Sequence, residues 1–256
     1  MTVELEQYEN RIIVFIDILG FKEHINKTQG NPEYFSKMRN TLNFISELKN
    51  PLWGGEENGR QVTVFSDSIV ISYPIELEGS VYSLLLDVIN IQLEMTNVGI
   101  LMRGGLTFGD VCHKDNIVFG PAMIDAYELE SKAANYPRVV INKDVFQIVE
   151  ENAYKQAYEG KIALVAVEGE LKEVTNLCKQ DWDGQWYVDF LRQYEEVNTI
   201  DDYLKAIRTI REVIITQIEH NPSKPSVLMK YGWLRSYFND VVQELELPKE
   251  LHIGDE

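Results

Sequence analysis

Two aspartates in this chain have the setting expected of ligands for a divalent cation. Asp17 lies inside the apolar run RIIVFIDIL, residues 11–19, which predicts a buried strand. A lone carboxylate there costs on the order of several kcal/mol, because its charge loses hydration. Asp67 lies at the turn of a predicted hairpin, residues 61–73. Neighbouring strands are about 5 Å apart, so the two carboxylates can meet and offer the oxygen ligands that a hard cation prefers.

Each aspartate alone has an ordinary structural interpretation. Asp17 can cap the turn after its strand, and aspartate is common at hairpin turns such as that of Asp67. Backbone N–H groups at Gly20 and Phe21, where a helix is predicted to begin, add a feature that favours phosphate. The combination therefore indicates a site for a metal ion and a phosphate group.

A second candidate is Arg103, in the strand-like segment ILMRGGLT, residues 100–107. Its guanidinium is predicted to stabilise charge on phosphates; the alternative is a surface arginine paired with an acid. Gly104 and Gly105 are unusual inside a strand, and we expect them to let a neighbouring backbone or a ligand approach closely. Lys22 is a further cation near the first aspartate, although a lysine in a first helical turn is usually only solvated.

The elements that must position these residues follow a regular order up to residue 141. Strand, helix, hairpin, helix, two strands, helix and strand can be assigned in turn. Local hairpins mixed with helical crossovers predict an α+β fold, a ferredoxin-like open sheet with helices packed on one side. We expect this core to span residues 11–145.

The pattern changes beyond residue 145. The segment KIALVAV, residues 161–167, predicts another strand, and Asp183-Gly184 predicts a hairpin. Two long amphipathic helices follow from residue 199, with a break at residues 221–225. Residues 146–256 are therefore expected to form accessory strands and a helical C-terminal extension packed on the core.

Composition excludes several classes of partner. The chain has 24 Lys and Arg against 41 Asp and Glu, a net charge of −17, which disfavours nucleic acid and anionic membranes. Only two cysteines occur, no signal peptide is apparent, and no apolar run approaches the ~20 residues of a membrane span. A cytoplasmic location is expected. The four histidines are scattered, which argues against the ligand cluster of a metallophosphatase.

Four segments in order resemble the class III nucleotidyl cyclases. FIDILGFKEH resembles the first metal-binding motif, FSDSIVIS the hairpin with the second metal aspartate, and MRGGLTFGDV the strand that begins with arginine. FGPAMIDAYELESKAANYPRVVI resembles the last helix and strand of the catalytic core. These segments are residues 15–24, 65–72, 102–111 and 119–141.

The resemblance implies the cyclase fold and assigns roles to residues. Asp17, Asp67 and the Ile18 carbonyl would bind two Mn²⁺ or Mg²⁺ ions, one acidifying the ribose 3′-hydroxyl and the other neutralising the triphosphate. Arg103 would stabilise charge during catalysis. Head-to-tail homodimers with active sites at the interface are implied as well. The nucleotide contacts implied are Phe15, Leu19, Gly20, Phe21 and Thr63.

Departures from the sequence pattern of the purine cyclases narrow the range of expected substrates. Ile124 and Glu128 stand where those enzymes carry the asparagine and arginine that stabilise the transition state. Thr63 and Ile117 stand where they read the base. The pyrimidine cyclases of bacterial anti-phage (Pycsar) systems share these departures. The resemblance implies conversion of UTP or CTP to the 3′,5′-cyclic monophosphate as a signal for an anti-phage effector. UTP is favoured on family frequency. The alternative is a cyclase-like domain that has lost catalysis and serves as nucleotide sensor or scaffold.

Overall fold

Strand β1 (Glu9–Ile18) lies at the centre of the structure and is buried on both faces. The computed structural model describes residues 7–47, 59–160, 163–196 and 199–254. Side chains alternate along a strand, so Ile12, Val14 and Ile16 join one apolar cluster while Ile13 and Phe15 join another. An apolar run of this kind, without alternating polar residues, requires cover on both sides.

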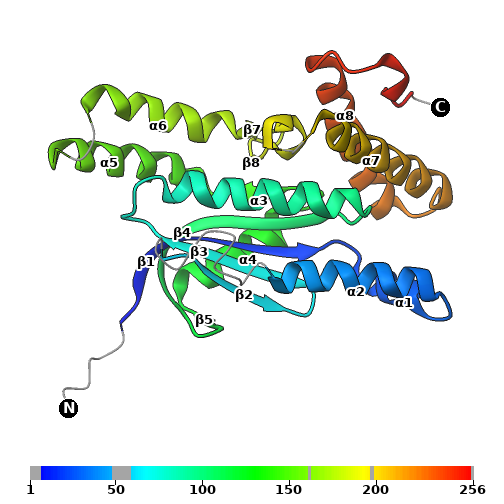
Figure 1. The fold of residues 1–256 in the computed structure, drawn as a ribbon, viewed down its shortest axis with the longest axis horizontal. Helices are drawn as coiled ribbons and strands as arrows, with labels where there is room; N and C mark the ends of the chain where they lie inside the picture. Colours follow the sequence, from blue (N-terminus) through cyan, green and yellow to red (C-terminus); the bar gives the residue numbers. More distant parts are fainter. Residues whose placement is uncertain (1–6, 48–58, 161–162, 197–198, 255–256) are drawn as a thin grey trace.

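The described strands form one open sheet, which confirms the predicted α+β class (Figure 1). Its order is β2-β3-β1-β4-β6-β8-β7, with β5 paired to β4 off this path. The β2–β3 hairpin is as predicted, and β4 also pairs in parallel with β6. The remaining strands are β2 (Gln61–Phe65), β3 (Ser68–Pro74), β4 (Met102–Lys114), β5 (Ile117–Phe119), β6 (Val139–Ile141), β7 (Cys178–Gln180) and β8 (Trp186–Val188).

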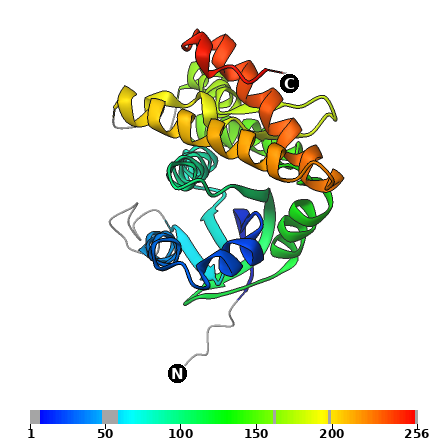
Figure 2. The same cartoon turned by 90° about the vertical axis from the view of Figure 1, so that its right-hand side faces the viewer.

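Helices cover both faces of the core sheet, so the expectation of helices on one side is wrong. α2 (Pro32–Glu47) and α3 (Ser80–Asn97) bury side chains in the larger cluster. α4 (Pro121–Ala133) packs on the opposite face, against β4 and β1 (Figure 2). The reason is the second apolar face of β1, which α4 covers with Ala122 and Ala126. A short helix, α1 (Phe21–Thr28), directly follows β1.

The C-terminal part extends the sheet and adds a layer of helices. β8 pairs with β6, and Asp183-Gly184 lies in the β7–β8 hairpin as predicted. The helices are α5 (Asp144–Tyr158), α6 (Leu164–Asn176), α7 (Ile200–His220) and α8 (Pro225–Glu244), with 3-10 turns at Phe190–Arg192, Tyr194–Glu196 and Lys249–Leu251. No helix among the described residues is long and apolar enough to cross a bilayer.

The strand predicted for residues 161–167 is wrong. Residues 161 and 162 lie outside the described residues, and α6 begins at Leu164. Val167, Leu171 and Val174 recur at helical spacing and are buried or partly buried. Helical packing on the core therefore overrides the β propensity of the valines.

Arg138 attaches the extension to the core. Its side chain is fully buried, and its guanidinium pairs with Asp181 and Asp183 of the β7–β8 hairpin. Trp233 of α8 donates a 2.6 Å hydrogen bond to Asp181, and its ring stacks on Tyr136. One side chain thus joins β6, the hairpin and α8.

The glycine pair in β4 sets the close packing of three elements. A Cβ at Gly104 would lie 2.5 Å from the Phe15 carbonyl oxygen, and one at Gly105 would lie 2.3 Å from the Ala126 carbonyl oxygen. Both contacts are with backbone, which has no room to retreat. The close approach expected at these glycines is therefore made by β1 and α4.

Gly105→Ala should destabilise the fold by about 2 kcal/mol or more, because α4 must move off the sheet. Chemical denaturation measures the change. Gly232→Ala, in α8, is the matched control, since nothing lies within 4 Å of the added Cβ. It should be neutral or stabilise by roughly 0.5–1 kcal/mol. Equal stability of the two variants would contradict this account of Gly105.

Candidate active site

The two predicted aspartates are brought together where β1 meets the β2–β3 turn. Asp17 pairs in register with Ser68, whose hydroxyl donates a 3.2 Å hydrogen bond to the Asp17 carboxylate. The Ile18 N–H donates to the backbone oxygen of Asp67 at 3.0 Å, which fixes the turn against the end of β1. Burial and the neighbouring Asp67 charge raise the pKa of Asp17. The site therefore concentrates negative charge.

Arg103 lies opposite Asp17 on the neighbouring strand. Its Nη2 is 3.9 Å from Asp17 Oδ2, and its Nε is 2.7 Å from Glu130 Oε1. About a quarter of the Arg103 side chain is exposed, whereas Glu130 is buried. The Nε side of the guanidinium is thus paired with Glu130, while Nη2 faces Asp17 and part of the side chain is exposed to solvent.

Glu130 was missed by the sequence analysis. Burial raises the pKa of its carboxyl, while the Arg103 charge opposes that shift. The signal was present in the spacing of Ala122, Ala126 and Glu130, which recur every four residues and define the inward face of α4. A carboxylate on that buried face needs a cationic partner on the strands against which α4 packs.

The donors at this site suit a hard divalent cation. Asp17 and Asp67 contribute carboxylate oxygens, and their mutual repulsion shows negative charge that Arg103, shared with Glu130, does not fully compensate. No group of three or more His, Cys, Asp or Glu side chains able to hold a metal occurs in the described part of the chain. Ligation by the Ile18 carbonyl stays a prediction.

The predicted phosphate-binding turn follows directly. Gly20 has a φ of 72°, a left-handed conformation that favours glycine, and α1 begins at Phe21. Leu19 and Phe21 are partly buried beside it. Phe15 is 8% exposed, and its ring lies 5.6 Å from that of Tyr127 on α4, measured between centroids.

Thr63 lies in a buried polar network on the same face of the sheet. His113 is 3.0 Å from the Thr63 hydroxyl and 2.8 Å from that of Ser72, which accepts a hydrogen bond from Arg11. Burial and the Arg11 charge lower the pKa of His113 to about 4. The Thr63 hydroxyl is therefore engaged within this chain, whereas Ile117 is 61% exposed on β5.

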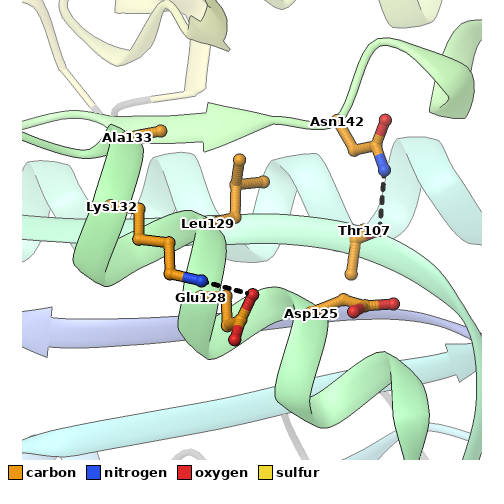
Figure 3. A pocket seen from close by; sticks show the side chains of 7 residues that line it. All are labelled: Thr107, Asp125, Glu128, Leu129, Lys132, Ala133 and Asn142. Atoms are coloured by element: carbon orange, nitrogen blue, oxygen red, sulfur yellow. Dashed lines mark hydrogen bonds and ion pairs between the residues drawn. The ribbon is translucent and has the colours of Figure 1, made fainter.

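A pocket of 330 Å³ lies beside α4 and is lined by residues of α4, by Thr107 of β4 and by Asn142 after β6 (Figure 3). Glu128 forms a 2.7 Å ion pair with Lys132, and the Asn142 amide donates a 3.2 Å hydrogen bond to the Thr107 hydroxyl. Ile124, one turn earlier on α4, is exposed. Ile124 and Glu128, which stand where purine cyclases stabilise the transition state, are therefore on the surface of this chain.

Comparisons with known proteins give distant similarities. No protein-family model and no curated protein matches the chain. The catalytic core of a rhodopsin-guanylyl cyclase with converted specificity, in complex with ATPalphaS, is 16% identical, with a TM-score of 0.42 over 57% of this chain and 84% of that one. The monomeric guanylyl cyclase domain of a fusion protein from the aquatic fungus Blastocladiella emersonii is 15% identical, with a TM-score of 0.41 over 57% and 88%.

An adenylate/guanylate cyclase/hydrolase from Silicibacter pomeroyi is 18% identical, with a TM-score of 0.39 over 56% of this chain and 83% of that one. All three TM-scores lie below 0.5, so the chemistry of this site rests on its own residues.

The lowered pKa of His113 predicts a specific loss of stability in acid. The unfolded chain binds a proton near pH 6.5 that the folded chain resists until about pH 4, so stability falls as pH falls through this window. His113→Gln should remove about 3 kcal/mol of that dependence, since one pKa unit corresponds to about 1.4 kcal/mol. Denaturation of both proteins at pH 7 and pH 4 measures it. Parallel pH curves would contradict the prediction.

Proposed function

We propose that this chain is a metal-dependent nucleotidyl cyclase that acts on a pyrimidine nucleoside triphosphate. The observation that carries the proposal is the convergence of Asp17 and Asp67 beside Arg103, on the segments that resemble the cyclase motifs. The reaction joins the ribose 3′-oxygen to the α-phosphorus and releases pyrophosphate.

In this proposal Asp17 and Asp67 hold two Mn²⁺ or Mg²⁺ ions, with the Ile18 carbonyl as a further donor. Such ions, when bound, acidify the attacking hydroxyl and neutralise phosphate charge. Arg103 donates its exposed N–H groups to phosphate oxygens, and Glu130 fixes its orientation through Nε. The backbone N–H groups at the start of α1, after Leu19 and Gly20, receive the rest of the triphosphate.

Two features support a pyrimidine base. Thr63 is bound to a neutral His113, so this position carries no charged group that could read a purine as lysine or glutamate does. Ile117 offers only an apolar wall. We propose UTP ahead of CTP, with the cyclic product as a signal for an anti-phage effector.

A homodimer with active sites at the interface is part of the proposal. Large apolar side chains are exposed just before β1, on β5 and on α4, and an exposed apolar surface is typical of a protein–protein interface. Sedimentation of the wild-type chain at micromolar concentration measures its mass in solution, which should be that of a homodimer. The side chains concerned are Tyr8, Ile117, Phe119, Ile124 and Tyr127.

A second candidate is a cyclase-like domain that binds nucleotide without turning it over. It is favoured by Ile124 and by Glu128, whose charge is taken up by Lys132, at the positions where purine cyclases stabilise the transition state. A product assay separates the two, because a sensor or scaffold binds nucleotide and yields no cyclic product.

Asp17→Asn and Asp67→Asn should each lower cyclase turnover at least a hundredfold. Each removes a carboxylate ligand and also relieves the repulsion between the pair, so both variants should remain folded. Mass spectrometry of the product measures turnover. Asp240→Asn, which loses an exposed ion pair with Lys179, is the control and should keep activity. Near wild-type turnover in either site variant would refute the two-carboxylate site.

Base selection is tested by incubating the wild-type chain with each of the four nucleoside triphosphates and Mn²⁺. A pyrimidine triphosphate should exceed ATP and GTP by at least roughly tenfold in kcat/KM, about 1.4 kcal/mol of differential transition-state binding. Identification of the cyclic products by mass gives the order. Cyclic AMP or cyclic GMP as the main product would contradict the pyrimidine assignment while leaving the cyclase proposal in place.

A further inference from the structure

A large groove separates the first two helices from the last two. It has a volume of 1100 Å³ and lies between α1 and α2 on one side and α7 and α8 on the other, at the right of Figure 1. Its lining includes Leu19 and Gly20, which follow the metal-binding strand, and Leu101 near the start of β4. We call it the basic groove, after the four lysines that line it: Lys27, Lys37, Lys224 and Lys230.

The charge of the basic groove is opposite to that of the chain. Its four lysines face two acids, Glu23 and Glu212, whereas the whole chain carries a net charge of −17. None of the four lysines forms an ion pair with a carboxylate among the described residues. Cations that outnumber the acids of a groove, and that form no ion pair with them, indicate a site for an anion in an otherwise acidic protein.

Two of these lysines are held close together. The ammonium groups of Lys27 and Lys37 lie 5.8 Å and 5.4 Å from the centre of the Tyr34 ring. Lys37 also packs inward, 3.8 Å from where a Cβ of Gly99 would lie. Burial and the Lys27 charge lower the pKa of Lys37. A bound anion would relieve the repulsion between the ammonium groups of Lys27 and Lys37.

Uncharged groups of the lining complete a ligand site. His24 lies 2.6 Å from the Tyr34 hydroxyl, and burial together with the two lysines lowers its pKa, so it is neutral at pH 7. Burial raises the pKa of Tyr231 to about 12, which keeps its hydroxyl a donor. Asn221 and Gln217, hydrogen-bonded to each other, add amides.

We infer that the basic groove binds a small molecule carrying two or more phosphate groups, through ammonium groups contributed by α1, α2 and the segment from Lys224 to Lys230. Lysine ammonium groups bind phosphate as compact point charges. The volume of 1100 Å³ lies just above the range of about 300–1,000 Å³ that is typical of small-molecule sites, so the groove has room for a nucleotide. The chemistry is shared by nucleoside polyphosphates and inorganic polyphosphate. The groove is distinct from the carboxylate site, because Asp17, Asp67 and Arg103 do not line it, although Leu19 and Gly20 border both.

Direct binding tests the inference without reference to catalysis. Inorganic tripolyphosphate, UTP and ATP are titrated calorimetrically into the wild-type chain in EDTA at low salt. Lys27→Gln/Lys230→Gln should weaken binding of tripolyphosphate at least tenfold. Lys27→Arg/Lys230→Arg keeps the charge and should stay within about threefold of wild type. The control Lys249→Gln, at an exposed lysine that does not line the groove, should leave binding unchanged.

A further variant separates this groove from the active site. Arg103→Gln should not change binding in EDTA if the groove is the site. A nucleotide that binds tighter than tripolyphosphate identifies a nucleoside polyphosphate as the ligand, and equal affinities identify the phosphate chain alone. The inference is overturned if no titrant binds at millimolar concentration, if the glutamine pair binds like wild type, or if Arg103→Gln abolishes binding. Because none of these readouts is turnover, failure of the cyclase proposal leaves the result intact.

Discussion

The buried guanidinium of Arg138 is the constraint on which the arrangement of the two halves depends. A fully buried cation without partners costs several kcal/mol or more, so Asp181 and Asp183 must reach it from the β7–β8 hairpin. Trp233 secures Asp181 from α8. The backbone oxygen of Arg138 also accepts the N–H of Gly104, so the residue that anchors the extension also fixes β4 beside the candidate site.

The position of β4, which Arg138 helps to fix, also determines the geometry of the candidate site through close packing. With β4 fixed, Gly104 and Gly105 admit the backbones of β1 and α4 at distances that no side chain permits. That approach brings Glu130 beneath Arg103, and Arg103 toward Asp17. The charged groups are thus positioned by backbone geometry. The repulsion between Asp17 and Asp67 is a local electrostatic conflict of the kind that often marks a functional site.

The sequence predicted what depends on local pattern and missed what depends on contacts between distant elements. The hairpin around Asp67 and the end of β1 at Asp17 were predictable from turn residues and apolar runs. Glu130 was missed because its partner, Arg103, lies on strand β4 and not on α4, although the buried face of α4 could be identified from the sequence. The helices were wrongly assigned to one side, although the alternate residues of β1 are equally apolar and therefore require cover on both faces. The four lysines of the basic groove come from distant segments, so no local spacing revealed them.

The two proposed anion sites of this chain differ in the sign of their local charge. At the candidate active site Asp17, Asp67 and Glu130 outnumber Arg103, so a polyphosphate can enter only with cations that reverse the local sign. In the basic groove lysines outnumber acids, so a polyphosphate can enter without a metal. Residues 19 and 20 border the groove and directly follow the aspartate strand. Four lysines of this acidic chain line one groove, and that groove lies next to a candidate site with an excess of carboxylates. The arrangement would allow a polyphosphate to be bound in the groove separately from any chemistry at the carboxylates.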